Sequence, residues 1–211
     1  MTNETMMWLM KYTAGYVLIA AAVFTYALIY YFVVFKPALK NAEYPEKLLR
    51  FDAVYGWQLF QYLQRILPIL ANRCGVPMPK IIFMKNTTGI GVHYSAFSAD
   101  YAFIITPECT EYSEEDFEIV LLRQIGYYRR RRQWRLLVQH WLFIMSGQHY
   151  VWQPLKEDVA IDRYAAGFSD RKRVITLLRY ALASTNAADE PSMHIKLRKR
   201  IDALESQGEH A

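Results

Sequence analysis

The sequence predicts an α+β protein: a mainly helical domain with a small β-sheet, preceded by one N-terminal transmembrane helix. Three observations lead to this class. An uncharged, apolar stretch lies near the N-terminus, and most of the remaining chain has apolar residues at helical spacing. Two short runs rich in β-branched and aromatic residues lie between prolines and turn residues in the middle of the chain. With 211 residues, 53% of them hydrophobic, the chain suits one domain plus an appendage.

Residues 13–35 form the predicted membrane span, after a tail of residues 1–12. They contain no charged residue, and at about 1.5 Å rise per residue they cross a hydrocarbon core of about 30 Å. A cleaved signal peptide has a shorter apolar region and a small-residue cleavage site, whereas this stretch ends in bulky aromatic residues. Before the span, Lys11 is the one basic side chain, whereas four basic residues follow it closely: Lys36, Lys40, Lys47 and Arg50. The positive-inside rule therefore predicts a single-pass protein of the inner or plasma membrane with a cytoplasmic C-terminal domain.

Residues 36–205 form the predicted domain, and residues 206–211 a tail. We expect Lys36-Pro37 to end the span. A helix follows from Pro45 to Cys74, kinked or divided by Pro68 and capped by Gly75. The next elements are a strand in residues 80–85, a turn in residues 86–91, and a second strand within residues 95–106 that is strongest at residues 101–105.

A central helix is predicted from Ser113 to Trp134. Ser113 and Asp116 have the spacing of an N-terminal capping pair, and apolar residues then cover nearly all sides of the helix. Arg123 and Gln124 therefore lie where burial is expected. The helix ends in a basic run that suits a solvated or lipid-facing position beside anionic headgroups: Arg129, Arg130, Arg131 and Arg132.

Three more helices are predicted, at residues 157–166, 172–183 and 193–204. In the last of them we expect Ile195, Ile201 and Leu204 to face inward and the basic residues to face outward. The aromatic stretch of residues 134–152 is too interrupted to span a bilayer, and two interpretations stay open for it. It lies in the membrane interface or re-enters the membrane, or it packs within the domain.

The cysteines and histidines do not predict a metal site or a cofactor. Cys74 and Cys109 are too far apart for a metal knuckle and are expected to be buried free thiols. The five histidines contain no pair at the helical i, i+4 spacing of a zinc-binding helix.

The order of these pieces resembles the plan of membrane zinc metallopeptidases of the gluzincin class over most of the chain. Residues 72–82 resemble the opening of such domains, residues 103–107 the strand before the metal helix, and residues 113–121 the start of that helix. The spacing of Asp158 and Asp162 is similar to the Glu-x-x-x-Asp motif, and residues 190–204 are similar to the ending of the family. The relatives are the CAAX-prenyl and heat-shock-type membrane endopeptidases and the antirepressor-type peptidase domains of β-lactam sensors. The resemblance implies a zincin-like fold.

The positions that carry the metal site in those peptidases are changed in this chain. Where the resemblance places His-Glu-x-x-His, the chain has Arg123, Gln124 and Tyr127. An arginine cannot bind zinc, a glutamine cannot act as a general base, and a protonated tyrosine is a poor ligand. Asp158 takes the place of the third ligand and Asp162 that of a supporting carboxylate. The resemblance thus implies a pseudoenzyme without a metal, in which we expect Arg123 to pair with Asp158 or Asp162, or else with Glu157.

We therefore predict a catalytically inactive, metallopeptidase-like protein that binds or regulates other proteins. Its expected partners are the bilayer and other membrane proteins or extended peptides, which would pair with an edge strand formed by Tyr94, Ser95, Ala96, Phe97 and Ser98. Two alternatives are an active zinc metallopeptidase with relocated ligands and a membrane-tethered nucleic-acid-binding protein that uses the basic run. We do not expect nucleic acid as a partner, because the run lacks a recognisable binding module around it.

Overall fold

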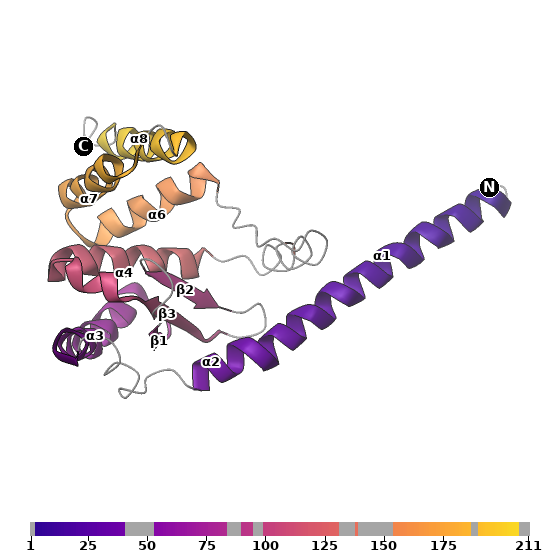
Figure 1. The fold of residues 1–211 in the computed structure, drawn as a ribbon. Coiled ribbons are helices and arrows are strands. Elements are labelled where there is room, and N and C mark those ends of the chain that lie inside the picture. The colour runs from indigo at the N-terminus through magenta and orange to yellow at the C-terminus, as the bar shows by residue number, and fades with distance from the viewer. Residues whose placement is uncertain are drawn as a thin grey trace.

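The computed structural model describes residues 3–40, 53–83, 90–94, 99–130, 138, 154–186 and 190–206. In this part of the chain the structure is mostly helical, with a three-stranded sheet and one N-terminal apolar helix (Figure 1). The predicted α+β class is therefore confirmed. The aromatic stretch of residues 134–152 lies outside the described residues, apart from Val138, and so does the tail after Ser206.

The N-terminal segment is one long helical rod that projects from the domain (Figure 1). It consists of α1 (Asn3–Tyr30), a π-helical turn η1 (Tyr31–Phe35) and α2 (Lys36–Lys40). The part from Met10 to Ala38 is long and apolar enough to cross a membrane. We expected the span to end at Lys36-Pro37; the apolar part ends at Ala38, and the helix itself continues to Lys40. A proline conflicts with the carbonyl four residues before it, and the wider π turn, in which the Lys36 N–H donates to the Tyr31 carbonyl, accommodates Pro37.

The sheet has the strand order β1-β3-β2. Strand β1 (Lys80–Phe83) is parallel to β3 (Tyr101–Ile105), and β2 (Gly91–Tyr94) is antiparallel to β3. The two predicted strands are confirmed in β1 and β3. Gly91, which we assigned to a turn, instead begins β2, a strand too short for its pattern to be visible in the sequence.

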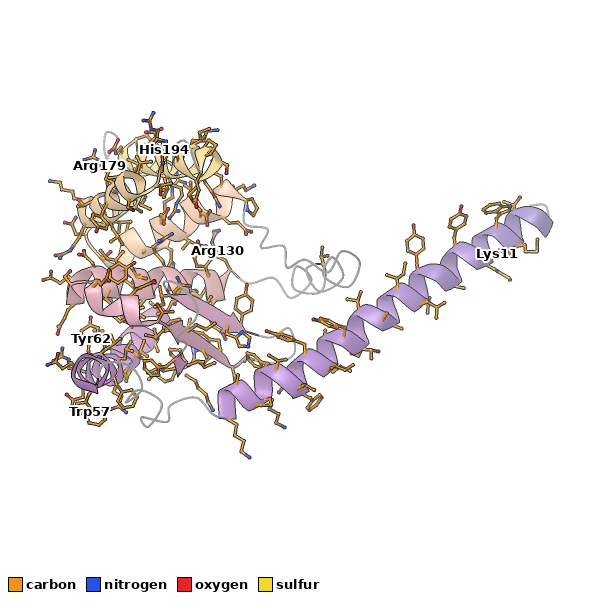
Figure 2. The ribbon with its side chains drawn as sticks, in the orientation of Figure 1. Lys11, Trp57, Tyr62, Arg130, Arg179 and His194 are labelled. Atoms are coloured by element: carbon orange, nitrogen blue, oxygen red, sulfur yellow. The ribbon has the colours of Figure 1, made fainter. Side chains whose placement is uncertain are left out.

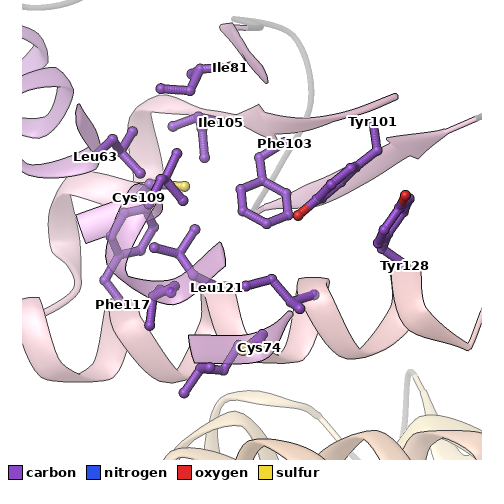
Figure 3. Close-up of a cluster of buried hydrophobic side chains, with 14 of the residues drawn as sticks. Leu63, Cys74, Ile81, Tyr101, Phe103, Ile105, Cys109, Phe117, Leu121 and Tyr128 are labelled. Carbon is purple, nitrogen blue, oxygen red and sulfur yellow. The ribbon is translucent and has the colours of Figure 1, made fainter. Parts of the chain in front are cut away.

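The two faces of the sheet contact different parts of the chain, because side chains alternate along each strand. Ile81, Phe103 and Ile105 face the main core, which Figure 3 shows between the strands and α4. On the opposite face, Ala102 lies in a small cluster with Phe35 of the anchor, which is 0% exposed. The Phe35 ring also lies 4.9 Å from the ring of His93 in β2, measured between centroids. The sheet is therefore enclosed between the domain core and the last turns of the anchor helix.

Helix α3 (Ala53–Cys74) is unbroken, so Pro68, which we expected to kink or divide it, does not divide it. Its Leu63, Leu67 and Leu70 are fully buried in the main core, and this packing outweighs the hydrogen bond that Pro68 cannot make. The predicted cap at Gly75 is confirmed, since Gly75 has a φ of +61°. The Val76 N–H donates to the Ala71 carbonyl at 3.0 Å, the pattern of a Schellman motif.

Helix α4 (Glu114–Arg129) follows a short 3₁₀ helix, η3 (Pro107–Glu111). The predicted cap is present: the Asp116 N–H donates to the Ser113 hydroxyl at 3.2 Å. Residues on all sides of α4 are buried, as expected. The helix ends at Arg129, earlier than the predicted Trp134, and the Arg130 N–H donates to the Gly126 carbonyl to close the last turn.

Three C-terminal helices form a layer over α4: α6 (Leu155–Phe168), α7 (Arg171–Ser184) and α8 (Pro191–Glu205) (Figure 1). A Cβ atom on Gly126 would lie 3.2 Å from side-chain atoms of Ile161 and Tyr164, so a glycine allows α4 and α6 to pack closely. In α8 the prediction for two residues is wrong. Ile195 is 54% exposed and Arg200 only 6%, because the inward face consists of Leu197, Arg200, Ile201 and Leu204. Cys74 and Cys109 are buried free thiols, as predicted.

Candidate functional site

The candidate site is a buried network of charged side chains where α4, α6 and α8 meet. Its centre is Asp162 of α6, which is 0% exposed. Arg200 of α8 donates to both Asp162 oxygens, from Nε to Oδ2 at 2.6 Å and from Nη2 to Oδ1 at 2.9 Å. Arg123 of α4 donates from Nε to Oδ1 at 2.9 Å. The predicted pairing of Arg123 with one of the two aspartates is therefore present, and its partner is Asp162.

Asp158, one helical turn before Asp162, forms the second half of the network and is 2% exposed. The Tyr127 hydroxyl of α4 donates to Asp158 Oδ1 at 2.7 Å, and the Lys196 ammonium of α8 lies 2.5 Å from Oδ2. Residues four apart lie on the same side of a helix. Each of the three helices thus contributes one such pair: Arg123 and Tyr127, Asp158 and Asp162, Lys196 and Arg200.

Two residues of the network, Arg200 and Tyr127, have pKa values that the surrounding groups raise. Burial opposes the charged form of Arg200, but its hydrogen bonds to Asp162 and the attraction of both carboxylates outweigh burial and raise its pKa. Burial raises the pKa of Tyr127, and the nearby Asp158 carboxylate adds to this, although Arg123 acts in the opposite direction. Tyr127 therefore stays protonated and donates its hydrogen bond.

Gln124 lies beside the network but has a different role. Its side chain is buried, and its Nε2 lies 3.4 Å from the Ile90 carbonyl, which it can reach as a donor. Ile90 directly precedes β2. Gln124, which stands where the resemblance would place a general base, therefore connects α4 to the start of an edge strand.

The network does not fit the zinc ion that the resemblance implies. A catalytic zinc needs three neutral or anionic ligands and one open position. Arg123 is a permanent cation, the Tyr127 hydroxyl donates to Asp158, and both carboxylates are held by cations. In the part of the chain that the structure describes, no group of three His, Cys, Asp or Glu side chains could hold a metal ion.

The other predicted site residues are only partly described. Tyr94 is the last residue of β2, which lies at one edge of the described sheet, and residues 95–98 fall outside the described part. Arg129 and Arg130 are exposed at the end of α4 (Figure 2), whereas residues 131 and 132 are outside the described part. Arg129 also packs within the domain, since its Nη1 donates to the Cys74 carbonyl at 3.2 Å.

Two residues of the network were missed from the sequence, Lys196 and Arg200. The signal for Arg200 was present: it lies three residues after Leu197 and four before Leu204, on the same apolar side of the helix. We instead took it as part of a basic, outward face.

Comparison with known proteins found no protein-family model that matches the chain, and no curated protein or solved structure that is similar to it.

Proposed function

We propose that this chain is a membrane-anchored, catalytically inactive protein on a zincin-like plan, whose domain binds and regulates other proteins. The observation that carries this proposal is the buried Arg123–Asp162–Arg200 cluster. Within it, Arg123 stands where the resemblance places the first metal ligand and Asp162 where it places a supporting carboxylate, so a fixed cation takes the place of a ligand.

The chemistry of these side chains supports an inactive site. General acid–base catalysis needs a group that exchanges protons near the working pH. Arginine does not titrate in this range, the Gln124 amide is neutral, and the pKa of Tyr127 is raised by burial. Asp158 and Asp162 both accept hydrogen bonds from cations, so neither is free to activate water.

The binding role rests on β2, an edge strand of the described sheet. An edge strand can pair with an extended peptide through main-chain hydrogen bonds, and its side chains then give selectivity. Gln124 reaches the carbonyl just before β2 and so helps to hold the strand in place before any peptide arrives. The partners we propose are extended segments of other membrane proteins, because the anchor confines the domain to the membrane surface.

Metal analysis of the purified full chain tests the inactive site. We expect zinc far below one ion per chain. Stoichiometric zinc that is lost in Asp158→Ala but kept in Asp202→Asn, a change at an exposed position of α8, would overturn the proposal. That result would favour an active metallopeptidase with relocated ligands.

Site-specific photo-crosslinking in native membranes tests the binding strand. A photoreactive side chain at Ser95, next to β2, is expected to capture a protein that the same probe at Lys199 on the exposed side of α8 does not. Crosslinks to lipid alone, or the same products from both positions, would contradict a peptide-binding role for this edge.

A further inference from the structure

A groove on the domain, separate from the β2 edge, lies between α3 and the start of α4. It consists of two hollows with about 470 and 690 Å³ of empty volume that share Gln58, Tyr62 and Glu114. The smaller hollow is lined mainly by aromatic or apolar residues, with Leu59 and Tyr62 on α3 opposite Cys109, Tyr112 and Phe117, whereas Gln61 and Arg65 line the larger one. The groove can therefore take an aliphatic or aromatic side chain from outside.

The groove is held open by contacts between its two walls. The Tyr62 hydroxyl donates to the Glu114 backbone carbonyl at 2.8 Å, and the Arg65 guanidinium lies 3.3 Å from the Glu114 carboxylate. The Tyr112 ring stacks on Phe117 with centroids 6.2 Å apart, and Tyr112 is 37% exposed. A preformed groove with ordered walls loses little conformational entropy when a partner binds.

The rim of the groove is acidic although the chain as a whole carries a net charge of +5. No lysine or arginine occurs between Lys85 and Arg123, whereas Glu108, Glu111 and Glu114 lie along the wall that η3 and α4 form. Burial raises the pKa of Tyr62 to about 12, and the carboxylates of Glu118, Glu114 and Glu115 add to the shift. Burial also raises the pKa of Tyr112, with Glu108 and Glu111 among the contributors. Both tyrosine hydroxyls thus lie within reach of these carboxylates, although Arg65 acts in the opposite direction on the pKa of Tyr62 and Arg123 on that of Tyr112.

The groove faces away from the membrane anchor. Figure 1 shows α3 on the opposite side of the domain from the direction in which α1 leaves, and Figure 2 shows Tyr62 there. The basic end of α4, with Arg129 and Arg130, is about 24 Å away along the helix. Anionic headgroups attract basic surfaces and repel acidic ones. The charge distribution thus favours a partner in solution for the groove and not the bilayer.

We propose that this groove binds a basic segment of a soluble or peripheral partner protein, which inserts one apolar side chain and places lysines or arginines along Glu108 and Glu111. The apolar side chain would lie against Tyr62, whose ring packs on that of Phe117 with centroids 6.0 Å apart. The surrounding charges would set the choice of partner and speed its association, which is the usual effect of complementary charge at an interface.

A positional-scanning decapeptide library, presented to the full chain in phosphatidylcholine nanodiscs, tests this proposal. We expect selection of lysine or arginine next to leucine, phenylalanine or tryptophan. The selected peptide is then made with a fluorescent label, and its Kd is measured by anisotropy at low salt. No selection, or selection of acidic peptides, would overturn the proposal.

Variants at exposed positions locate the binding site without disturbing the fold. The double change Glu108→Gln and Glu111→Gln is expected to weaken binding roughly fivefold, since each exposed ion pair contributes about 0.5 kcal/mol. Gln58→Trp, which fills the groove, is expected to weaken it more. Matched controls are Asp202→Asn for charge and Gln64→Trp for bulk on α3, and both should bind as the parent chain does.

Three outcomes would refute the assignment even if a peptide is selected. The first is equal binding by the parent chain and the double glutamine variant. The second is a Kd that follows the content of anionic lipid in the nanodisc, which would mean that the peptide binds the bilayer. The third is self-association of the chain that depends on Glu108 and Glu111, which would make a second copy the occupant of the groove.

Discussion

Replacement of Arg200 by methionine is the most direct test of the buried network. Arg200 makes two of the three hydrogen bonds that Asp162 accepts, at 2.6 and 2.9 Å, and only Arg123 remains after the change. Removing one partner of a buried ion pair costs about 3–5 kcal/mol, because it leaves a buried charge without compensation. For a domain of this size, 1 kcal/mol shifts the Tm by about 2–4 °C, so we expect a fall of about 6–20 °C.

The measurement is urea and thermal unfolding of the full chain in detergent, followed by circular dichroism. Arg198→Met, at an exposed position of the same helix, is the matched control and should change stability by less than about 0.5 kcal/mol. The double variant Asp162→Leu and Arg200→Met should be less damaging than the sum of its single changes, since it removes both charges. A loss below about 1 kcal/mol for Arg200→Met, or additive single changes, would refute the reasoning.

Three further predictions concern other contacts. Arg123→Leu removes one hydrogen bond to Asp162 while Arg200 retains two, so the free energy of unfolding should fall by about 1.5–3 kcal/mol, less than in Arg200→Met. Equal losses of unfolding free energy in urea for the two variants would contradict this order. Burial lowers the pKa of His93, so as pH falls the unfolded chain binds a proton at this histidine before the folded chain does, and the free energy of unfolding should decrease below about pH 6.5. His93→Leu should therefore make Tm depend less on pH between pH 7 and 5. A pH dependence of Tm that is the same in His93→Leu would contradict the assignment to His93. Phe35→Ala should weaken the contact of the anchor with the sheet by about 3–5 kcal/mol and speed hydrogen exchange in β1 and β3, while Phe32→Ala, at a position 56% exposed, should not.

Elements with strong local signals could be predicted from the sequence. The cap at Ser113, the C-terminal glycine at Gly75 and the runs that form β1 and β3 depend on residues close together in the chain. That Arg123 pairs with Asp158 or Asp162 could also be predicted, because the resemblance to the peptidases supplied both candidates. Helical spacing places Arg123 on a buried side of α4, and a buried guanidinium needs a carboxylate.

Elements whose structure depends on distant residues could not be predicted. The spacing of Arg200 to Leu197 and Leu204 indicated that it faces inward, but its partners could not be predicted from α8. These partners are two carboxylates of α6, and one of them, Asp162, lies 38 residues earlier in the chain. Pro68 and Pro37 are local helix breakers, but packing at Leu67 and a π turn before Lys36 keep both helices continuous. Strand β2 forms because it pairs with β3, and the sequence of its own four residues does not predict this pairing.

The contact between Phe35 and the sheet links the orientation of the N-terminal helix to the domain. Burying one phenylalanine contributes about 1.5–3 kcal/mol, which is the size of the gap between the two states of many conformational switches. A rotation or tilt of α1 that moves Phe35 away from Ala102 would free the outer face of the sheet, including the side of β2 that carries His93. A lipid or protein that binds the N-terminal helix and favours one of its orientations by about this free energy would therefore change which face of the sheet is accessible to partners.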